Sequence, residues 1–133
     1  MAEAGAALWG SLVLAADDPA ALAGFYAACL AVKAQPGLSA SHWRVPWPAG
    51  GWLELYAPSS RRPQPRQQGR LALCLQRQAE GSEPLAVLST WVTAALALGA
   101  SLQEKARQES FGAEAWLLDP EGNRLLLLVL HQP

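Results

Sequence analysis

The sequence predicts an α+β protein built from two tandem βαβββ modules. A strand-like segment, an amphipathic helix and further strand-like segments follow one another twice along the 133 residues, an order typical of α+β folds. The turns Pro48-Ala-Gly50 and Pro120-Glu-Gly122 lie 72 residues apart, which indicates an internal duplication. Each module is expected to pack one helix on one face of its sheet and to leave the other face free to line a cavity. The expected boundaries are about 7–57 for module one, 58–69 for a linker and about 70–131 for module two, within a single domain of residues 1–133.

The first module begins with a short apolar strand and continues into a helix. Residues Trp9 to Ala15 are strand-like. Asp18 is the expected N-cap and Pro19 the first helical residue, because an aspartate side chain accepts from free backbone amides and proline fixes a helical φ angle. The helix is expected to run to Val32. Its apolar stripe consists of Leu22, Phe25, Tyr26, Cys29 and Leu30.

Further strands and a linker complete the first module. Residues Ser41 to Val45 and Gly51 to Tyr56 are strand-like and are joined by the turn 46–50, and another short strand is expected near Lys33 to Gln35. The segment 58–69 is rich in proline and arginine and has no apolar periodicity, so we interpret it as an exposed linker. It contains no aromatic side chains that could stack on bases, which argues against a nucleic-acid site.

The second module repeats this order of elements. Residues Leu71 to Gln76 are strand-like, and Glu83-Pro84 begins a second helix that is expected to end at Gly99. The polar segment 101–110 is interpreted as an edge strand.

A hairpin is expected to close the second module. The strands Ala113 to Leu118 and Arg124 to Leu130 flank the turn Asp119–Asn123. In that turn Pro120 suits the second position, and Gly122 accepts a positive φ angle.

Composition and charge exclude several classes of protein. Hydrophobic residues make up 51% of the chain, charged residues 16%, and the net charge is −1, so neither a disordered chain nor a nucleic-acid-binding tail is expected. The apolar run Pro84 to Ala100 is interrupted by hydroxyl residues and is too short for a membrane span. No basic region precedes an apolar segment near the N-terminus, so we expect no secretory signal and a cytoplasmic location. Cys29 and Cys74 lack metal-type spacing and are expected to be free thiols.

Three segments, in this order along the chain, carry a family resemblance. They are Asp18-Pro-Ala-Ala-Leu-Ala-Gly-Phe-Tyr26, Leu98-Gly99-Ala100 and Asp119-Pro-Glu-Gly-Asn-Arg124. With them the chain resembles the glyoxalase/bleomycin resistance/dioxygenase superfamily, also called vicinal oxygen chelate proteins, and above all its small glyoxalase-like domains. The resemblance covers nearly the whole chain. It implies that the sheets of the two modules form a cup-shaped mixed sheet with the helices on the outer face, often in a homodimer.

The resemblance also implies where a metal ion would be held. Enzymes of the superfamily bind a divalent metal ion in the cup, through ligands on the first and last strands of each module. The matching positions in this chain are Ser11, Glu54, Ala72 and Leu126. Only Glu54 carries a metal-binding group, whereas a catalytic divalent ion needs about three protein ligands. We therefore expect no metal site and no cofactor.

Strand alternation predicts the lining of the cup. Residues two apart on a strand share a face. The positions that match metal ligands face the cup, so the residues two positions away from them on the same strand are expected to face it too. If each hairpin folds symmetrically about its turn, the facing pairs are Arg44 with Glu54, His42 with Tyr56, and Trp116 with Leu126. The expected ligand-binding residues are Trp9, Ser11, Arg44, Trp52, Glu54, Tyr56, Cys74, Gln76, Trp116 and Leu126.

A wall of aromatic and aliphatic side chains with a few polar groups is typical of a small-molecule pocket. We expect a metal-free protein that binds an aromatic or amphipathic ligand in a tryptophan-lined cup, where aromatic rings stack on Trp9, Trp52 and Trp116. Two alternatives stay open for these residues. The tryptophans could belong to the core, and Glu54 could simply pair with Arg44 across the strands.

Two further functions are open on the sequence. One is a glyoxalase-like lyase, isomerase or dioxygenase that uses Glu54 as a metal-independent base, or an unrecognised metal site. The other is a non-catalytic interaction module, because the apolar segment Leu125–Leu130 needs cover on both faces. The expected partners are a small aromatic molecule and a second copy of the chain, with neither nucleic acid nor membrane.

Overall fold

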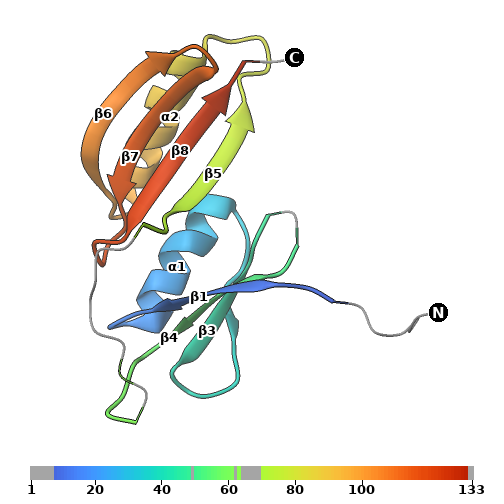
Figure 1. Cartoon of the computed structure of the whole chain (residues 1–133), viewed down its shortest axis with the longest axis vertical. Coiled ribbons are helices and arrows are strands. Elements are labelled where there is room, and N and C mark those ends of the chain that lie inside the picture. Colours follow the sequence, from blue (N-terminus) through green and yellow to red (C-terminus); the bar gives the residue numbers. More distant parts are fainter. Residues whose placement is uncertain (1–7, 49, 62, 64–69, 132–133) are drawn as a thin grey trace, which may run out of the picture. The chain divides into compact units, whose positions relative to one another are not determined.

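The computed structural model describes residues 8–48, 50–61, 63 and 70–131. The chain forms two compact units, Met1–Pro65 and Arg66–Pro133, and each unit is one βαβββ module with its own four-stranded mixed sheet (Figure 1). The predicted α+β class and the duplicated module are therefore confirmed. The union of the two sheets in one cup stays a prediction, and most of the predicted linker 58–69 lies outside the described residues.

Module one contains one helix and four strands. They are β1 (Ser11–Ala15), α1 (Pro19–Leu30), β2 (Gln35–Pro36), β3 (His42–Pro46) and β4 (Trp52–Tyr56). The strand order is β1-β4-β3-β2. The first strand runs parallel to β4, and the other neighbours are antiparallel.

The helix α1 begins where the sequence predicts and ends two residues earlier. The Asp18 carboxylate accepts a hydrogen bond from the Ala21 backbone amide at 3.1 Å, and Pro19 occupies the first turn. Ala31 has a φ angle of 55°, in the left-handed region that ends a helix. The helix therefore stops at Leu30 rather than at the predicted Val32.

The core of module one lies between α1 and one face of the sheet. Val45 on β3 and Leu53 and Leu55 on β4 are fully buried, as are Leu22 and Tyr26 on α1. Because side chains alternate along a strand, the residues between them on β3 and β4 belong to the opposite face. We call that surface the open face of module one.

Module two contains the same set of elements, one helix and four strands. Its elements are β5 (Leu73–Gln78), α2 (Pro84–Ala97), β6 (Ser101–Glu109), β7 (Gly112–Leu118) and β8 (Arg124–Leu130). The strand order β5-β8-β7-β6 confirms the predicted edge position of β6. The bounds of β8 match the prediction, whereas β5 begins two residues later than predicted. No helix among the described residues is long and apolar enough to cross a membrane.

The turn between β7 and β8 is organised by a buried carboxylate. Asp119 is only 3% exposed, and its Oδ1 accepts from the backbone amides of Glu121 at 2.9 Å and Asn123 at 3.0 Å. The side-chain amide of Asn123 donates to Oδ2 at 2.9 Å. Gly122 has a φ angle of 87°, as predicted. The turn thus fixes the register of the hairpin.

The central strand β8 is covered on one face by its own module. Leu125, Leu127 and Val129 are buried on the side of α2, where Leu88 is also buried. The alternate residues of β8 are half-buried on the other side of the sheet, which we call the open face of module two. The predicted cover on both faces is therefore shown for one face only.

Candidate functional site

The open face of module one carries a polar cluster centred on Glu54. Its Oε1 lies 3.0 Å from Nε2 of His42 and accepts a hydrogen bond from Nη2 of Arg44 at 3.2 Å. The side chains are 17% exposed for Glu54 and 12% for His42, so the contacts are sheltered but reachable from solvent. We call His42, Arg44, Trp52 and Glu54 together the Glu54 cluster.

The orientation of His42 is set by the loop that precedes its strand. The backbone amide of Leu38 donates to Nδ1 of His42 at 2.8 Å, so in the neutral imidazole the proton sits on Nε2, the nitrogen next to Glu54. The ring packs directly on Gly37, where an added Cβ would lie 2.5 Å from Cγ and Nδ1 of His42. A glycine is therefore needed at position 37 to let the ring reach the carboxylate.

Arg44 joins the carboxylate to an aromatic surface. Its Cζ lies 4.5 Å above the ring centroid of Trp52, a cation–π contact. Within the described residues the buried Nε of Arg44 has no hydrogen-bond partner. The guanidinium is thus held by one hydrogen bond and one stacking contact, which places it between Glu54 and Trp52.

The residues of the open faces do not fit a divalent metal ion. Ser11 on β1 is an exposed hydroxyl opposite Trp52, and Ala72 and Leu126 offer no donor atoms. In the described part of the chain, no three His, Cys, Asp or Glu side chains come close enough together to hold a metal ion. The guanidinium beside Glu54 also carries the charge that repels a cation.

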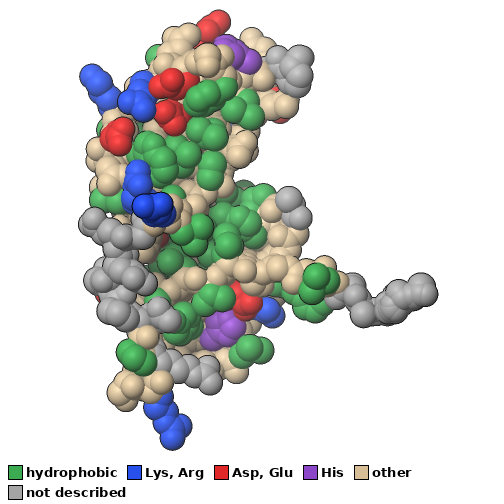
Figure 2. Space-filling model, viewed as in Figure 1, with side chains coloured by type: hydrophobic (Ala, Val, Ile, Leu, Met, Phe, Trp, Pro, Cys, Tyr) green, Lys and Arg blue, Asp and Glu red, His purple; other side chains and the backbone are tan. Residues whose placement is uncertain are grey.

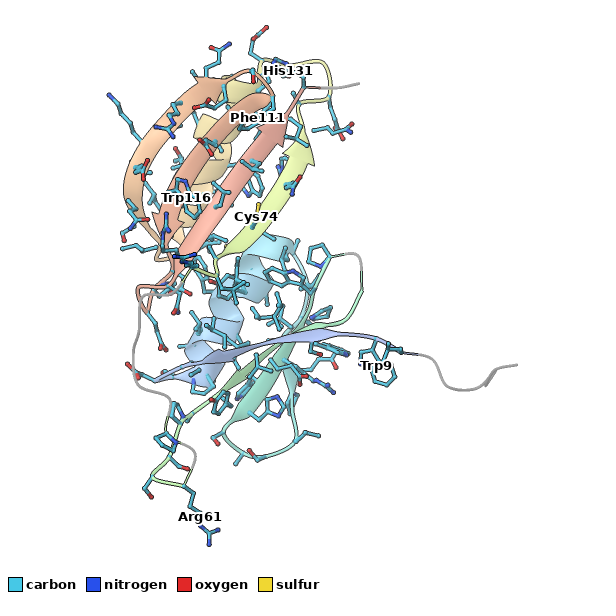
Figure 3. The ribbon with its side chains drawn as sticks, viewed as in Figure 1. Trp9, Arg61, Cys74, Phe111, Trp116 and His131 are labelled. Carbon is cyan, nitrogen blue, oxygen red and sulfur yellow. The ribbon has the colours of Figure 1, made fainter. Side chains whose placement is uncertain are left out.

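The open face of module two is more apolar. The Cζ of Arg124 on β8 lies 4.0 Å above the ring of Trp116 on β7, and Nε of Arg124 donates to Oε1 of Gln103 at 3.2 Å. Leu126 stands opposite Trp116 on β8, and Cys74 stands opposite Leu126 on β5 (Figure 3). Figure 2 shows hydrophobic side chains over β7 and β8, with acidic and basic ones along β6.

The two modules carry the same arginine–tryptophan contact with the partners exchanged. The repeat of 72 residues maps Arg44 of β3 onto Trp116 of β7, and Trp52 of β4 onto Arg124 of β8. Both pairs bridge the same diagonal of their hairpins. The position of Glu54 maps onto Leu126, so module two has the stacked pair without the carboxylate.

The structure confirms the three predicted strand pairings. Arg44 pairs with Glu54 and His42 with Tyr56. Trp116 pairs with Leu126. These registers bring most of the predicted site residues to the open faces, each within its own module.

One predicted site residue lies differently from expectation. The strand β1 begins at Ser11, so Trp9 precedes it and is 68% exposed (Figure 3); its assignment to the first strand was wrong. Gln76 is exposed on β5 opposite Leu128 and shares the open face with Cys74. The sequence reasoning missed Arg124, although the 72-residue repeat applied to Trp52 would have found it. It also undervalued His42, because only the loop contact shows where its ring points.

Neither cysteine is an activated nucleophile. Burial raises the pKa of the Cys29 thiol to about 11. Burial also raises the pKa of Cys74, and a hydrogen bond with Gln76 offsets part of that effect. Because the thiolate is the reactive form, both side chains are poorly reactive near neutral pH, and Cys74 contributes apolar surface to its sheet.

Comparisons with known proteins agree with this architecture. A family model described as a glyoxalase-like domain matches residues 11–128. The chain is similar to the crystal structure of a glyoxalase/bleomycin resistance protein from Albidiferax ferrireducens T118, with a TM-score of 0.66, 21% identity, and coverage of 94% of this chain and 98% of that one. A glyoxalase/bleomycin resistance protein/dioxygenase family enzyme from Burkholderia phytofirmans PsJN aligns with a TM-score of 0.68, 17% identity, and coverage of 90% and 96%.

A hypothetical protein from S. aureus aligns with a TM-score of 0.73, 14% identity, and coverage of 94% of this chain and 95% of that one. Among curated proteins no match is found. At these identities the structural likeness shows the fold.

Proposed function

Because the chain belongs to the glyoxalase-like domain family, we propose that it binds an aromatic or amphipathic small molecule, without a metal ion, on the open faces of its sheets. One observation carries the proposal: the Glu54 cluster presents an ordered arginine–carboxylate pair beside a tryptophan ring on a face that no helix of the module covers. Small-molecule sites combine an apolar wall with a few oriented polar groups of this kind.

The Glu54 cluster is preorganised for such a ligand. The imidazole of His42 and the guanidinium of Arg44 both contact Oε1 of Glu54, so within the described residues Oε2 is left as an acceptor for another molecule. Trp52 and Tyr56 each lie two residues from Glu54 on β4, on the same side of the strand. Rigid aromatic rings lose little conformational entropy when they meet a ligand, which supports this face as the binding surface.

The donor set supports the metal-free form of the proposal. Glu54 is the one residue with a metal-binding group among the four positions that resemble the family's ligands. In this structure its carboxylate is already engaged by Arg44. Since the guanidinium neutralises the carboxylate, the cluster suits a ligand that hydrogen-bonds and stacks better than it suits a divalent cation.

We expect Trp52→Ala to weaken binding of N-phenyl-1-naphthylamine, a neutral aromatic probe, at least about fivefold. The reason is that an aromatic contact contributes about 1 kcal/mol beyond the area it buries, and 1.4 kcal/mol is tenfold in affinity. The measurement is a fluorescence titration of wild type and variant. Trp91→Ala is the matched control, because Trp91 also stacks with an arginine, Arg77, at 4.3 Å but lies on α2. Equal affinity of wild type and Trp52→Ala would show that the probe does not bind on the open face of module one.

The proposal includes a homodimer and a ligand retained from the host. Native mass spectrometry of the purified protein, before any chelator is added, measures the mass of the assembly together with any bound organic molecule or metal. A metal-free dimer with an added organic mass is the expected result. A stoichiometric divalent metal would contradict the metal-free proposal.

A second candidate function is metal-independent acid–base catalysis by Glu54. The contact between Nε2 of His42 and Oε1 of Glu54 at 3.0 Å favours it, because a carboxylate oriented by a histidine can move a proton. In this case any lyase or isomerase activity found in a substrate screen should persist in EDTA and fall at least about 100-fold in Glu54→Gln. Activity lost on chelation, or retained in Glu54→Gln, would rule this candidate out.

A further inference from the structure

Arg44 and Arg124 differ in whether a carboxylate neutralises the charge of the guanidinium. Arg44 donates to the carboxylate of Glu54, whereas the equivalent position in module two is Leu126. Within the described residues no carboxylate lies within ion-pair distance of Arg124, and its hydrogen bond goes to the neutral side chain of Gln103. Arg124 therefore carries a positive charge that no carboxylate of the described residues pairs with.

The stacking contact leaves the guanidinium able to bind. The Cζ of Arg124 lies over the ring of Trp116, and the N–H groups of a planar guanidinium point outward in its own plane. The Nε–H group of Arg124 is used by Gln103. No hydrogen bond among the described residues uses either Nη group of Arg124, and together these groups match the two oxygens of a carboxylate or sulfonate.

The surroundings of Arg124 add apolar surface next to the charge. Trp116 and Leu126 face each other across β7 and β8, and Leu128 and Leu130 continue the row along β8. All four side chains are half-buried, so part of each is open to a ligand. A positive group at one end of an apolar row is complementary to a molecule with an acid head and an apolar body.

A second group of charged side chains lies on β6 and on the neighbouring strand β7, where Glu114 stands opposite Leu128. Arg107 lies 3.2 Å from Glu114 and 3.0 Å from Glu109, and these contacts raise the pKa of its exposed guanidinium. They leave this cluster with excess negative charge. An anion is therefore attracted to Arg124 and not to Arg107.

We infer that the open face of module two binds an amphipathic organic acid, with the acid group on the Nη atoms of Arg124 and the apolar body along Trp116 and the leucines of β8. This inference rests on the proposed function and names the charge class of the ligand. Arg124 is then the residue that selects an acid over a neutral molecule of the same shape.

The test uses two probes with one aromatic framework. 8-Anilino-1-naphthalenesulfonate carries a sulfonate, and N-phenyl-1-naphthylamine lacks it. In fluorescence titrations at about 0.15 M salt, where distant charges are screened, Arg124→Gln is expected to weaken binding of the sulfonate about tenfold, because a hydrogen bond to a charged group contributes about that factor. Binding of the neutral probe should change less than twofold.

Two further variants keep the experiment decisive. Arg77→Gln removes the same charge from an arginine that also stacks on a tryptophan, at 4.3 Å, and should leave the affinity for the sulfonate unchanged. Arg124→Lys keeps the positive charge but lacks the paired N–H groups of the guanidinium, so it should give an intermediate loss of affinity for the sulfonate. Circular dichroism of each variant confirms the native fold.

Each outcome separates this inference from the proposed function. Equal losses in Arg124→Gln and Arg77→Gln would show a general charge effect and overturn the inference. The inference would also be overturned if the affinity for the sulfonate did not depend on Arg124, or if the sulfonate did not bind at all. If the neutral probe still bound through Trp52 in that case, the proposed function would stand. Wild-type protein that binds neither probe would overturn both.

Discussion

Asp119→Ala is expected to destabilise module two by about 3 kcal/mol. The buried carboxylate accepts from the backbone amides of Glu121 and Asn123 and from the side chain of Asn123. Hydrogen bonds to a charged group contribute about 1.5–3 kcal/mol each and are not additive. Their loss leaves half-buried donors unpaired in the turn that fixes the register of β7 and β8.

The measurement is urea unfolding of wild type and variant followed by circular dichroism, with hydrogen exchange of residues 112–130 to assign the loss to the hairpin. Asp119→Asn keeps one carbonyl acceptor and should lose about half as much stability. A change below about 0.5 kcal/mol in Asp119→Ala, the range of ordinary surface substitutions, would show that the carboxylate does not organise the turn.

Gly112→Ala is expected to cost at least about 3 kcal/mol, because both the backbone and the space around it require glycine. Gly112 has a φ angle of 147°, and a Cβ there would overlap the carbonyl oxygen of Val129 and lie 3.0 Å from Cα of Leu130. Strain at such an angle costs about 1–3 kcal/mol, and the neighbouring atoms belong to the backbone of β8, which cannot move without breaking its ladder.

Gly24→Ala is the matched control. Gly24 lies in α1, and a Cβ at this position meets nothing within 4 Å. Alanine should therefore stabilise module one by about 0.5–1 kcal/mol. Thermal unfolding of the two variants should move in opposite directions, and a Gly112→Ala protein as stable as wild type would contradict the expected clash.

Local signals explain why so much of the fold could be predicted from the sequence. The turn Asp119–Asn123 combines a buried acceptor, a proline and a glycine, so its centre determines which residues pair, and the pair Trp116 with Leu126 follows. The start of α1 was equally well defined, since Asp18 and Pro19 both act within the first turn. In both cases the deciding interactions join residues fewer than five positions apart.

The features that could not be predicted depend on backbone angles and side-chain contacts that no residue type or spacing indicates. The early end of α1 results from the left-handed backbone of Ala31, which alanine does not indicate. His42 pairs with Tyr56 in the ladder, yet its ring reaches diagonally to Glu54 because Leu38 and Gly37 hold it there. Arg124 was missed for a similar reason, since a stacking contact across two strands leaves no mark in either strand's pattern.

The edge strand β6 determines how the sheet of module two can meet another chain. Its ladder with β7 is interrupted by register shifts between Leu102 and Glu104 and between Glu104 and Arg107, and charged side chains follow one another along it. Irregular pairing and charge at an edge prevent an incoming strand from aligning. The module can therefore carry a strand as apolar as β8 at its centre without offering, at this edge, a template on which a fibril could grow.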